Sequence, residues 1–195
     1  MSTLKVDTIL KRTGTGTITV GQSGDTISIP SGATLNSAGT NTLTGVDNTP
    51  AFFVALTTSV SISDNTFTKI PFATEIFDTD DAYDASTNYR FTVPSGKAGK
   101  YCFTFQGPIT ILKHYQVTIY LKKNGSYVGT ESLITNGYEQ SANTNITTRY
   151  TTTLDLAASD YIELWVKTNN NGTSTNFLHG DNLTTFFTGY KLIGV

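Results

Sequence analysis

The stretch that decides the fold runs from Tyr83 to Phe105 and reads YDASTNYRFTVPSGKAGKYCFTF. A glycine turn at Gly96 and Gly99 divides it into two parts. After the turn, aromatic residues occupy every second position, namely Tyr101, Phe103 and Phe105. Successive side chains of a strand point to opposite faces of a sheet, so this spacing places three rings on one face. Such alternation by itself predicts a strand in the core of a β-sandwich.

The whole stretch resembles the signature of the globular head of complement's first component, a jelly roll shared with the tumour necrosis factor superfamily. Further segments resemble the same family in the same order: Leu121–Gly125 as a strand end and turn, Leu154–Leu164 as a strand-turn-strand, and Phe186–Leu192 as the terminal strand. In the terminal strand, Thr188 stands for the family's serine. The resemblance implies a jelly-roll head over residues 50–195 that assembles as a homotrimer and binds ligands without catalysis.

Composition narrows the class of protein further. Charge is sparse and nearly balanced, with a formal net charge of −2, which argues against a nucleic-acid partner. Abundant Thr, Asn, Ser and Gly favour strands and turns over helices. No apolar segment is long enough to span a bilayer, so no membrane insertion is expected. Cys102 is the only cysteine, and we expect a buried free thiol within a strand.

The first 49 residues form a different region, built from a short repeat. A Thr followed by Ile or Leu recurs in steps of nine, nine, eight and eight residues, and its apolar members are Ile9, Ile18, Ile27, Leu35 and Leu43. Each unit has too few apolar residues to bury a core within one chain. We therefore expect these residues to pack against two other copies in a short trimeric β-stalk. A disordered Gly/Ser/Thr linker is the alternative interpretation. The punctuation at Gly45–Pro50 predicts the boundary with the head.

The opening segments Leu4–Ile9 and Arg12–Ile18 resemble the beginnings of structural proteins of tailed phages, especially marine and cyanobacterial ones. The start of the chain lacks the apolar core of a signal peptide. Together these features predict a virion protein that is made in the host cytoplasm and docks to other virion proteins through residues 1–45. The leading hypothesis is a short tail fibre whose head contacts a glycan or protein of the host surface. A capsid decoration, cement or head-fibre trimer is the alternative, and a free carbohydrate- or protein-binding module is the second.

The head is predicted to be an all-β, ten-stranded jelly-roll sandwich. The expected strands are 51–60, 66–71, 74–77, 88–93, 100–107, 114–123, 127–134, 144–156, 160–168 and 184–193, separated by turn residues. Core and trimer-interface candidates are Tyr101, Phe103, Phe105, Leu164, Trp165, Val166, Phe187 and Tyr190. In the strand 160–168, alternation makes both faces apolar, so we expect a trimer to cover the second face.

No catalytic pattern is present in the sequence. The two histidines, His114 and His179, lack metal-ligand spacing, so we expect a binding protein and no enzyme. Four carboxylates are calcium candidates: Asp78, Asp80, Asp81 and Asp84. The glycine and bidentate glutamate of a calcium loop are absent, so a solvated acidic loop without a cofactor is favoured. Ligand-contact candidates lie in the polar loop 169–181, namely Asn170, Asn171, Phe177 and His179.

Overall fold

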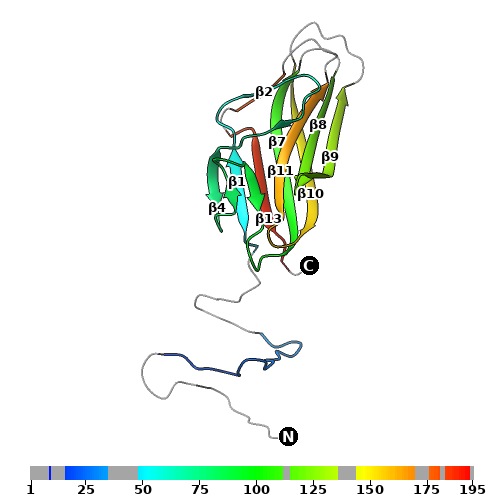
Figure 1. The fold of residues 1–195 in the computed structure, drawn as a ribbon. Coiled ribbons are helices and arrows are strands. Elements are labelled where there is room, and N and C mark those ends of the chain that lie inside the picture. The colour runs from blue at the N-terminus through cyan, green and yellow to red at the C-terminus, as the bar shows by residue number, and fades with distance from the viewer. Residues whose placement is uncertain are drawn as a thin grey trace. The chain divides into compact units, whose positions relative to one another are not determined.

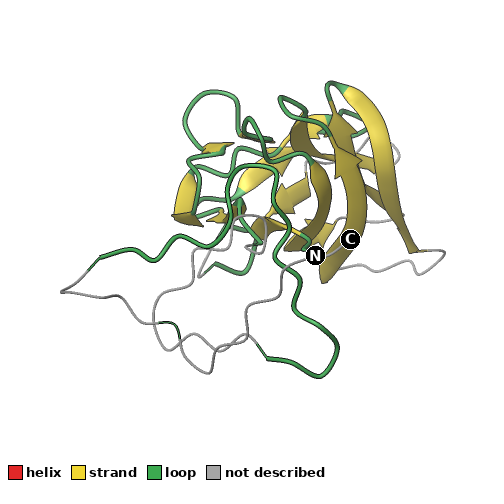
Figure 2. Cartoon of the chain, turned by 90° about the horizontal axis from the view of Figure 1, so that it is seen from below, coloured by secondary structure: helices red, strands yellow, loops and turns green. Residues whose placement is uncertain are grey.

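The computed structural model describes residues 9, 16–34, 48–111, 115–135, 144–169, 176–180 and 183–193. Contacts divide the chain into two units, with the division between Thr42 and Leu43. The described residues form strands, turns and loops and no helix (Figure 2). Consequently, no described segment offers a helix of the length and apolarity that a membrane crossing needs.

The head is a sandwich of two antiparallel sheets (Figure 1). The larger sheet has the order β2-β12-β7-β13-β1-β4, and β10 pairs with the other edge of β7. Its strands are β1 (Ala51–Ala55), β2 (Val60–Ile62), β4 (Thr74–Asp78), β7 (Gly99–Ile111), β10 (Thr144–Leu156), β12 (Asn176–Leu178) and β13 (Phe186–Lys191). The long strand β7 therefore organises this sheet, because β10 lies along one edge while β13 and β12 share the other.

The smaller sheet has the order β5-β6-β11-β8-β9, with β3 paired to β11. Its strands are β3 (Thr68–Lys69), β5 (Tyr83–Asp84), β6 (Arg90–Thr92), β8 (Tyr115–Lys123), β9 (Ser126–Thr135) and β11 (Tyr161–Asn169). The β8–β9 hairpin turns at Asn124-Gly125, where both residues have positive φ. That turn chemistry agrees with the predicted Asn-Gly separator.

The all-β class and the two-sheet jelly roll are confirmed, but the predicted count of ten strands is wrong. The described residues contain thirteen strands, and the predicted strand 51–60 ends at Ala55. The additional strands β2, β5 and β12 are only two or three residues long. Such short segments carry no periodicity of their own, and only their pairing partners define them. For example, β12 lies in the predicted loop 169–181 but pairs with both β2 and β7.

The core between the sheets is rich in aromatic rings centred on Phe52. Its ring centroid lies 5.1 Å from that of Tyr83, 5.1 Å from Phe91 and 5.2 Å from Phe187. The alternating residues of β7 complete this cluster, since Tyr101, Phe103 and Phe105 are all buried. The Tyr101 hydroxyl donates a hydrogen bond to the Lys97 carbonyl at 2.5 Å. Burial also raises the pKa of Tyr101 to about 12, so the phenol stays neutral.

The terminal strand β13 shows why its motif combines aromatic residues with a glycine. A Cβ atom at Gly189 would lie 2.6 Å from Cδ1 of Phe103 and 2.8 Å from Cε1 of Phe52. The glycine therefore leaves room for the two rings. Next to it, the Thr188 hydroxyl donates to the Phe52 carbonyl at 2.7 Å and links β13 to β1.

In the N-terminal unit, the described residues 16–34 contain two tight turns and no strand. The Asp25 amide donates to the Gln22 carbonyl, and the Ala33 amide donates to the Pro30 carbonyl, both at 3.0 Å. Gly24 and Gly32 supply positive φ in these turns, so the turns recur at the eight-residue step of the repeat. The repeat residues Ile9, Ile18 and Ile27 are exposed, whereas Leu35 and Leu43 lie outside the described residues. Stalk packing stays a prediction.

Candidate binding surfaces

The outward face of the larger sheet carries stacked aromatic rings that the core does not use. Phe53 of β1 stacks on Phe186 of β13, with ring centroids 5.0 Å apart, and lies 6.2 Å from Phe77 of β4. Phe77 is 46% exposed and its neighbour Ile76 is 47% exposed. A register shift in the β1–β4 pairing accompanies this exposure of two consecutive apolar residues.

Two further residues extend this surface along the same sheet. Tyr190 of β13 lies opposite Cys102 of β7, and Tyr190 is exposed while Cys102 is half-buried. A hydrogen bond from the Tyr190 hydroxyl to the Cys102 sulfur raises the pKa of Tyr190, and the electrostatic interaction with Cys102 and burial add to this effect. We call this surface the aromatic band, and it consists of Phe53, Ile76, Phe77, Cys102, Phe186 and Tyr190. Cys102 thus lies at the sheet surface, not in the core as the sequence predicted.

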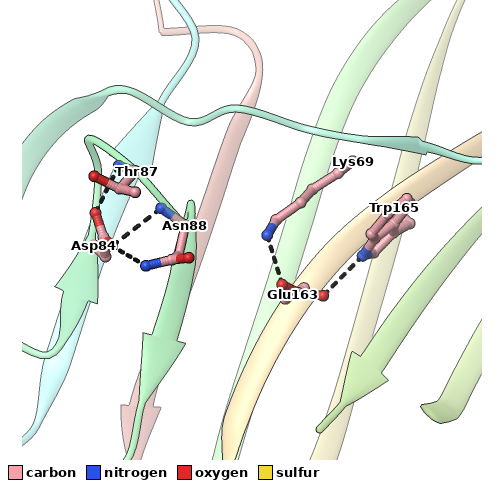
Figure 3. A network of polar contacts seen from close by, with 6 residues as sticks. All are labelled: Lys69, Asp84, Thr87, Asn88, Glu163 and Trp165. Atoms are coloured by element: carbon pink, nitrogen blue, oxygen red, sulfur yellow. Dashed lines mark hydrogen bonds and ion pairs between the residues drawn. The ribbon is translucent and has the colours of Figure 1, made fainter. Parts of the chain in front are cut away.

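The outward face of β11 differs from the sequence expectation, because it is polar as well as aromatic. Glu163 accepts hydrogen bonds from the Lys69 ammonium at 2.5 Å and from the Trp165 indole at 3.1 Å (Figure 3). Glu163 is only 8% exposed, whereas its partners Lys69 and Trp165 are half-buried. The opposite face of the strand is apolar, and Leu164 and Val166 are buried in the core. The Trp165 indole therefore has a hydrogen-bond acceptor within its own chain.

A second aromatic surface surrounds Trp165 on the smaller sheet. Phe67, Tyr120 and Tyr127 lie within 5.6 Å of one another, measured between ring centroids. Lysine side chains lie over these rings. We call this surface the lysine–aromatic patch, and it consists of Phe67, Tyr120, Lys122, Tyr127, Trp165 and Lys167. The sequence analysis did not identify it, although Tyr120 with Lys122 and Trp165 with Lys167 show the two-residue spacing of a shared face.

The acidic residues of the predicted calcium loop serve mainly as acceptors for backbone amides. Asp78 accepts from the Tyr83 amide at 2.6 Å, and Asp84 accepts from the Ser86 amide at 3.0 Å. Asp84 also accepts from the amides of Thr87 at 2.8 Å and Asn88 at 3.0 Å (Figure 3). These hydrogen bonds, the one from Thr87 foremost, hold the pKa of Asp84 well below its usual range.

The remaining carboxylates of this loop line an open depression of about 790 Å³, together with Asp84 and Arg90. Asp80 is 3.6 Å from the Lys97 ammonium, and Asp81 is exposed with a positive φ of 53°. Among the described residues, no group of three or more His, Cys, Asp or Glu side chains could hold a metal ion. The four aspartates do not converge on one point.

The predicted ligand loop is only partly within the described residues. Asn170 and Asn171 lie outside them, and Phe177 belongs to β12, where its backbone pairs with Ser61. His179 lies 2.5 Å from the Thr110 hydroxyl, which donates to Asn145 at 2.6 Å. His179 also accepts a hydrogen bond on its carbonyl from Thr185. These contacts tie His179 to the larger sheet.

This fold defines the class of protein as a two-sheet jelly-roll domain. The family model of the C1q domain matches residues 51–192, and the chain belongs to the C1q family. Domains of this family form homotrimers and are generally non-enzymatic binding modules.

Individual relatives are distant. The globular domain of zebrafish complement 1qA protein is 16% identical, with a TM-score of 0.49, over 73% of this chain and 96% of that one. The Eiger TNF from S. frugiperda is 14% identical, with a TM-score of 0.48, over 74% of this chain and 93% of that one. No curated protein matches the chain.

Proposed function

We propose that this chain is a non-enzymatic, homotrimeric virion surface protein, most simply a short fibre whose head contacts the host surface. The observation that carries the proposal is the aromatic band. Stacked rings and two exposed neighbouring residues form an apolar surface on one sheet of the head, and a surface of this kind marks a protein contact. A second and third copy would bury it.

The N-terminal unit supports the same assembly from a different observation. The described apolar side chains of the repeat are between 46% and 61% exposed: Ile9, Ile18, Val20, Ile27 and Ile29. A chain that spaces exposed aliphatic residues this evenly gains stability by burying them against other copies. Docking of residues 1–45 to other virion proteins completes the proposal, on the resemblance of that segment to phage structural proteins.

Sedimentation of the full chain at micromolar concentration tests the assembly. We expect a sedimenting species that contains three copies of the chain, because the aromatic band and the repeat both require partners. A stable folded monomer would overturn the trimer and the stalk together.

Deletion of residues 1–45 tests the division of labour between the two units. We expect the truncated chain to form a folded trimeric head. When added to virions that lack the protein, this head should not co-sediment with them, whereas the full chain should. If the isolated head binds particles as well as the full chain, the anchor lies in the head. A capsid cement role would then replace the fibre.

A further inference from the structure

The lysine–aromatic patch has the chemistry of a ligand site, and its geometry follows from strand register. In the β8–β11 pair, Tyr120 lies opposite Trp165, and Thr118 lies opposite Lys167. Residues two apart share a face, so one outward row of β8 faces one outward row of β11. Phe67 joins from the segment before β3, and Tyr127 joins from β9. Four strands or their ends thus contribute to one surface.

The aromatic members of the patch are accessible. Phe67 is 39% exposed and Tyr127 is 50% exposed, while Tyr120 and Trp165 are half-buried. Their ring faces carry partial negative charge. Such faces pack against the weakly positive C–H groups of a sugar ring. The exposed rings therefore suit a carbohydrate, whose C–H faces are flat and whose edges are polar.

The lysines give the patch a local positive charge. The Lys122 ammonium lies 3.9 Å from the Trp165 ring centroid and 4.8 Å from that of Tyr127, and the Lys167 ammonium lies 4.8 Å from that of Phe67. Rings hold these cations in place but do not neutralise them. Glu163 beside the patch pairs with Lys69, and among the described residues the ion pairs involve neither Lys122 nor Lys167. The patch therefore carries a local positive charge on a chain whose formal net charge is −2.

A small recess lies beside the rings, and Lys167 is one of the residues that line it. The cavity has a volume of about 40 Å³ and is lined by Gln116, Thr118, Tyr120, Lys167 and Asn169. Lys167 is the cationic residue of this lining. This volume exceeds the roughly 10–15 Å³ that one water molecule needs, so a small polar group can enter the recess.

We propose that the lysine–aromatic patch binds an acidic polysaccharide, with a sugar carboxylate at Lys167 and sugar rings against Phe67 and Tyr127. Charge complementarity selects the occupant, because a neutral glycan would leave Lys122 and Lys167 without a counter-charge. The proposal rests on the host-surface contact proposed above and names its ligand class. It places that contact on the flat outward face of the smaller sheet and not in the loop 169–181.

Binding of tetragalacturonate to the full chain tests this site. Trp165 is the only tryptophan and lies within the patch, so its fluorescence reports occupancy of this surface. We expect a saturable fluorescence change with tetragalacturonate, and none with its methyl ester, which lacks the charge. The variants Lys122→Gln and Lys167→Gln should each weaken binding about tenfold, as loss of one charge-assisted contact does.

The matched control is Lys123→Gln. Lys123 is adjacent in sequence and has the same charge, but its ammonium pairs with Asp160 at 2.7 Å, away from the rings. The control should bind like the parent. Three results would overturn the proposal: no binding of tetragalacturonate, equal binding of the methyl ester, or equal weakening by Lys123→Gln. Sedimentation of the parent and the same variants separates the ligand proposal from the proposed trimeric assembly. A trimer that does not bind tetragalacturonate rejects only the ligand proposal. A monomer that binds it rejects only the proposed assembly.

Discussion

The two outward faces of the sandwich are both aromatic, yet they differ in what surrounds the rings. On the larger sheet, the aromatic band stacks Phe53 on Phe186 with no described charged group over the rings. On the smaller sheet, each exposed ring has a lysine over it. Rings without charge favour burial against another apolar surface, whereas rings interleaved with cations stay hydrated and favour a polar, anionic ligand. We therefore propose that the same residue type serves self-association on one face and recognition on the other.

The largest effect on stability is expected in the core, which lies between the two sheets whose outward faces are compared. Replacement of Phe103 by Ala should lower the free energy of unfolding by about 3–5 kcal/mol, because it removes a fully buried ring. This is a large part of a typical domain stability of about 5–15 kcal/mol. Denaturant unfolding measures it. Tyr127→Ala, on the surface, is the control. A melting temperature for Phe103→Ala within a few degrees of that of the parent would contradict the assignment of this strand to the core.

A matched pair of surface charges separates the two faces directly. Phe77→Asp places a carboxylate in the aromatic band, and Tyr127→Asp places one in the lysine–aromatic patch, at similar exposures of 46% and 50%. We expect Phe77→Asp to abolish the trimer at micromolar concentration, because a buried unpaired charge is strongly unfavourable at an interface. Tyr127→Asp should leave the trimer intact. Sedimentation decides the matter, and dissociation by Tyr127→Asp alone would assign self-association to the opposite sheet.

The buried Glu163 carboxylate tests whether the polar contacts on the outward face of the smaller sheet stabilise the fold. Glu163→Gln should lower the free energy of unfolding by about 1–3 kcal/mol, because Lys69 loses its buried counter-charge. The Trp165 emission should also shift, since its indole hydrogen bond changes acceptor. Unfolding followed by tryptophan fluorescence measures both effects. Asp155→Asn is the control with the same change in charge at an exposed site, and an equal loss there would deny Glu163 a structural role.

The smallest effect is expected at Asp84, in the loop between β5 and β6. Its folded-state pKa lies below the ordinary value of 3.8, because backbone amides favour the ionised carboxylate. The resulting stability is fully present above pH 3.8 and is lost as the pH falls through the depressed folded-state pKa.

Asp84→Asn should therefore lower the melting temperature by about 3 °C at neutral pH, and the difference should shrink as the pH falls below 3.8. Melting curves of parent and variant across this range provide the test. Asp81→Asn, with the same change in charge at an exposed position of the same loop, is the control variant. A difference between parent and Asp84→Asn that stays constant with pH would contradict the assigned cause.

The sequence predicted the class of fold well because its strongest signals are local. Alternation placed Tyr101, Phe103 and Phe105 on one face, and the Asn-Gly turn joined β8 to β9. The sequence did not predict β2, β5 and β12, whose two or three residues acquire strand geometry only from neighbours distant in the chain. It also did not predict that Cys102 would lie at the sheet surface. Alternation identifies a shared face but not which face meets the core.

The amino-acid sequence by itself determined the longer strands of the head and which family it resembles, because periodicity and turn chemistry act over a few residues. Only the tertiary structure decided what each outward face contains. Lys69 meets Glu163 across 94 positions, and Thr188 meets Phe52 across 136. The lysine–aromatic patch likewise draws Phe67, Tyr127 and Trp165 from three separate segments. Contacts of this range depend on strand order and register, which are set by packing the whole sandwich at once.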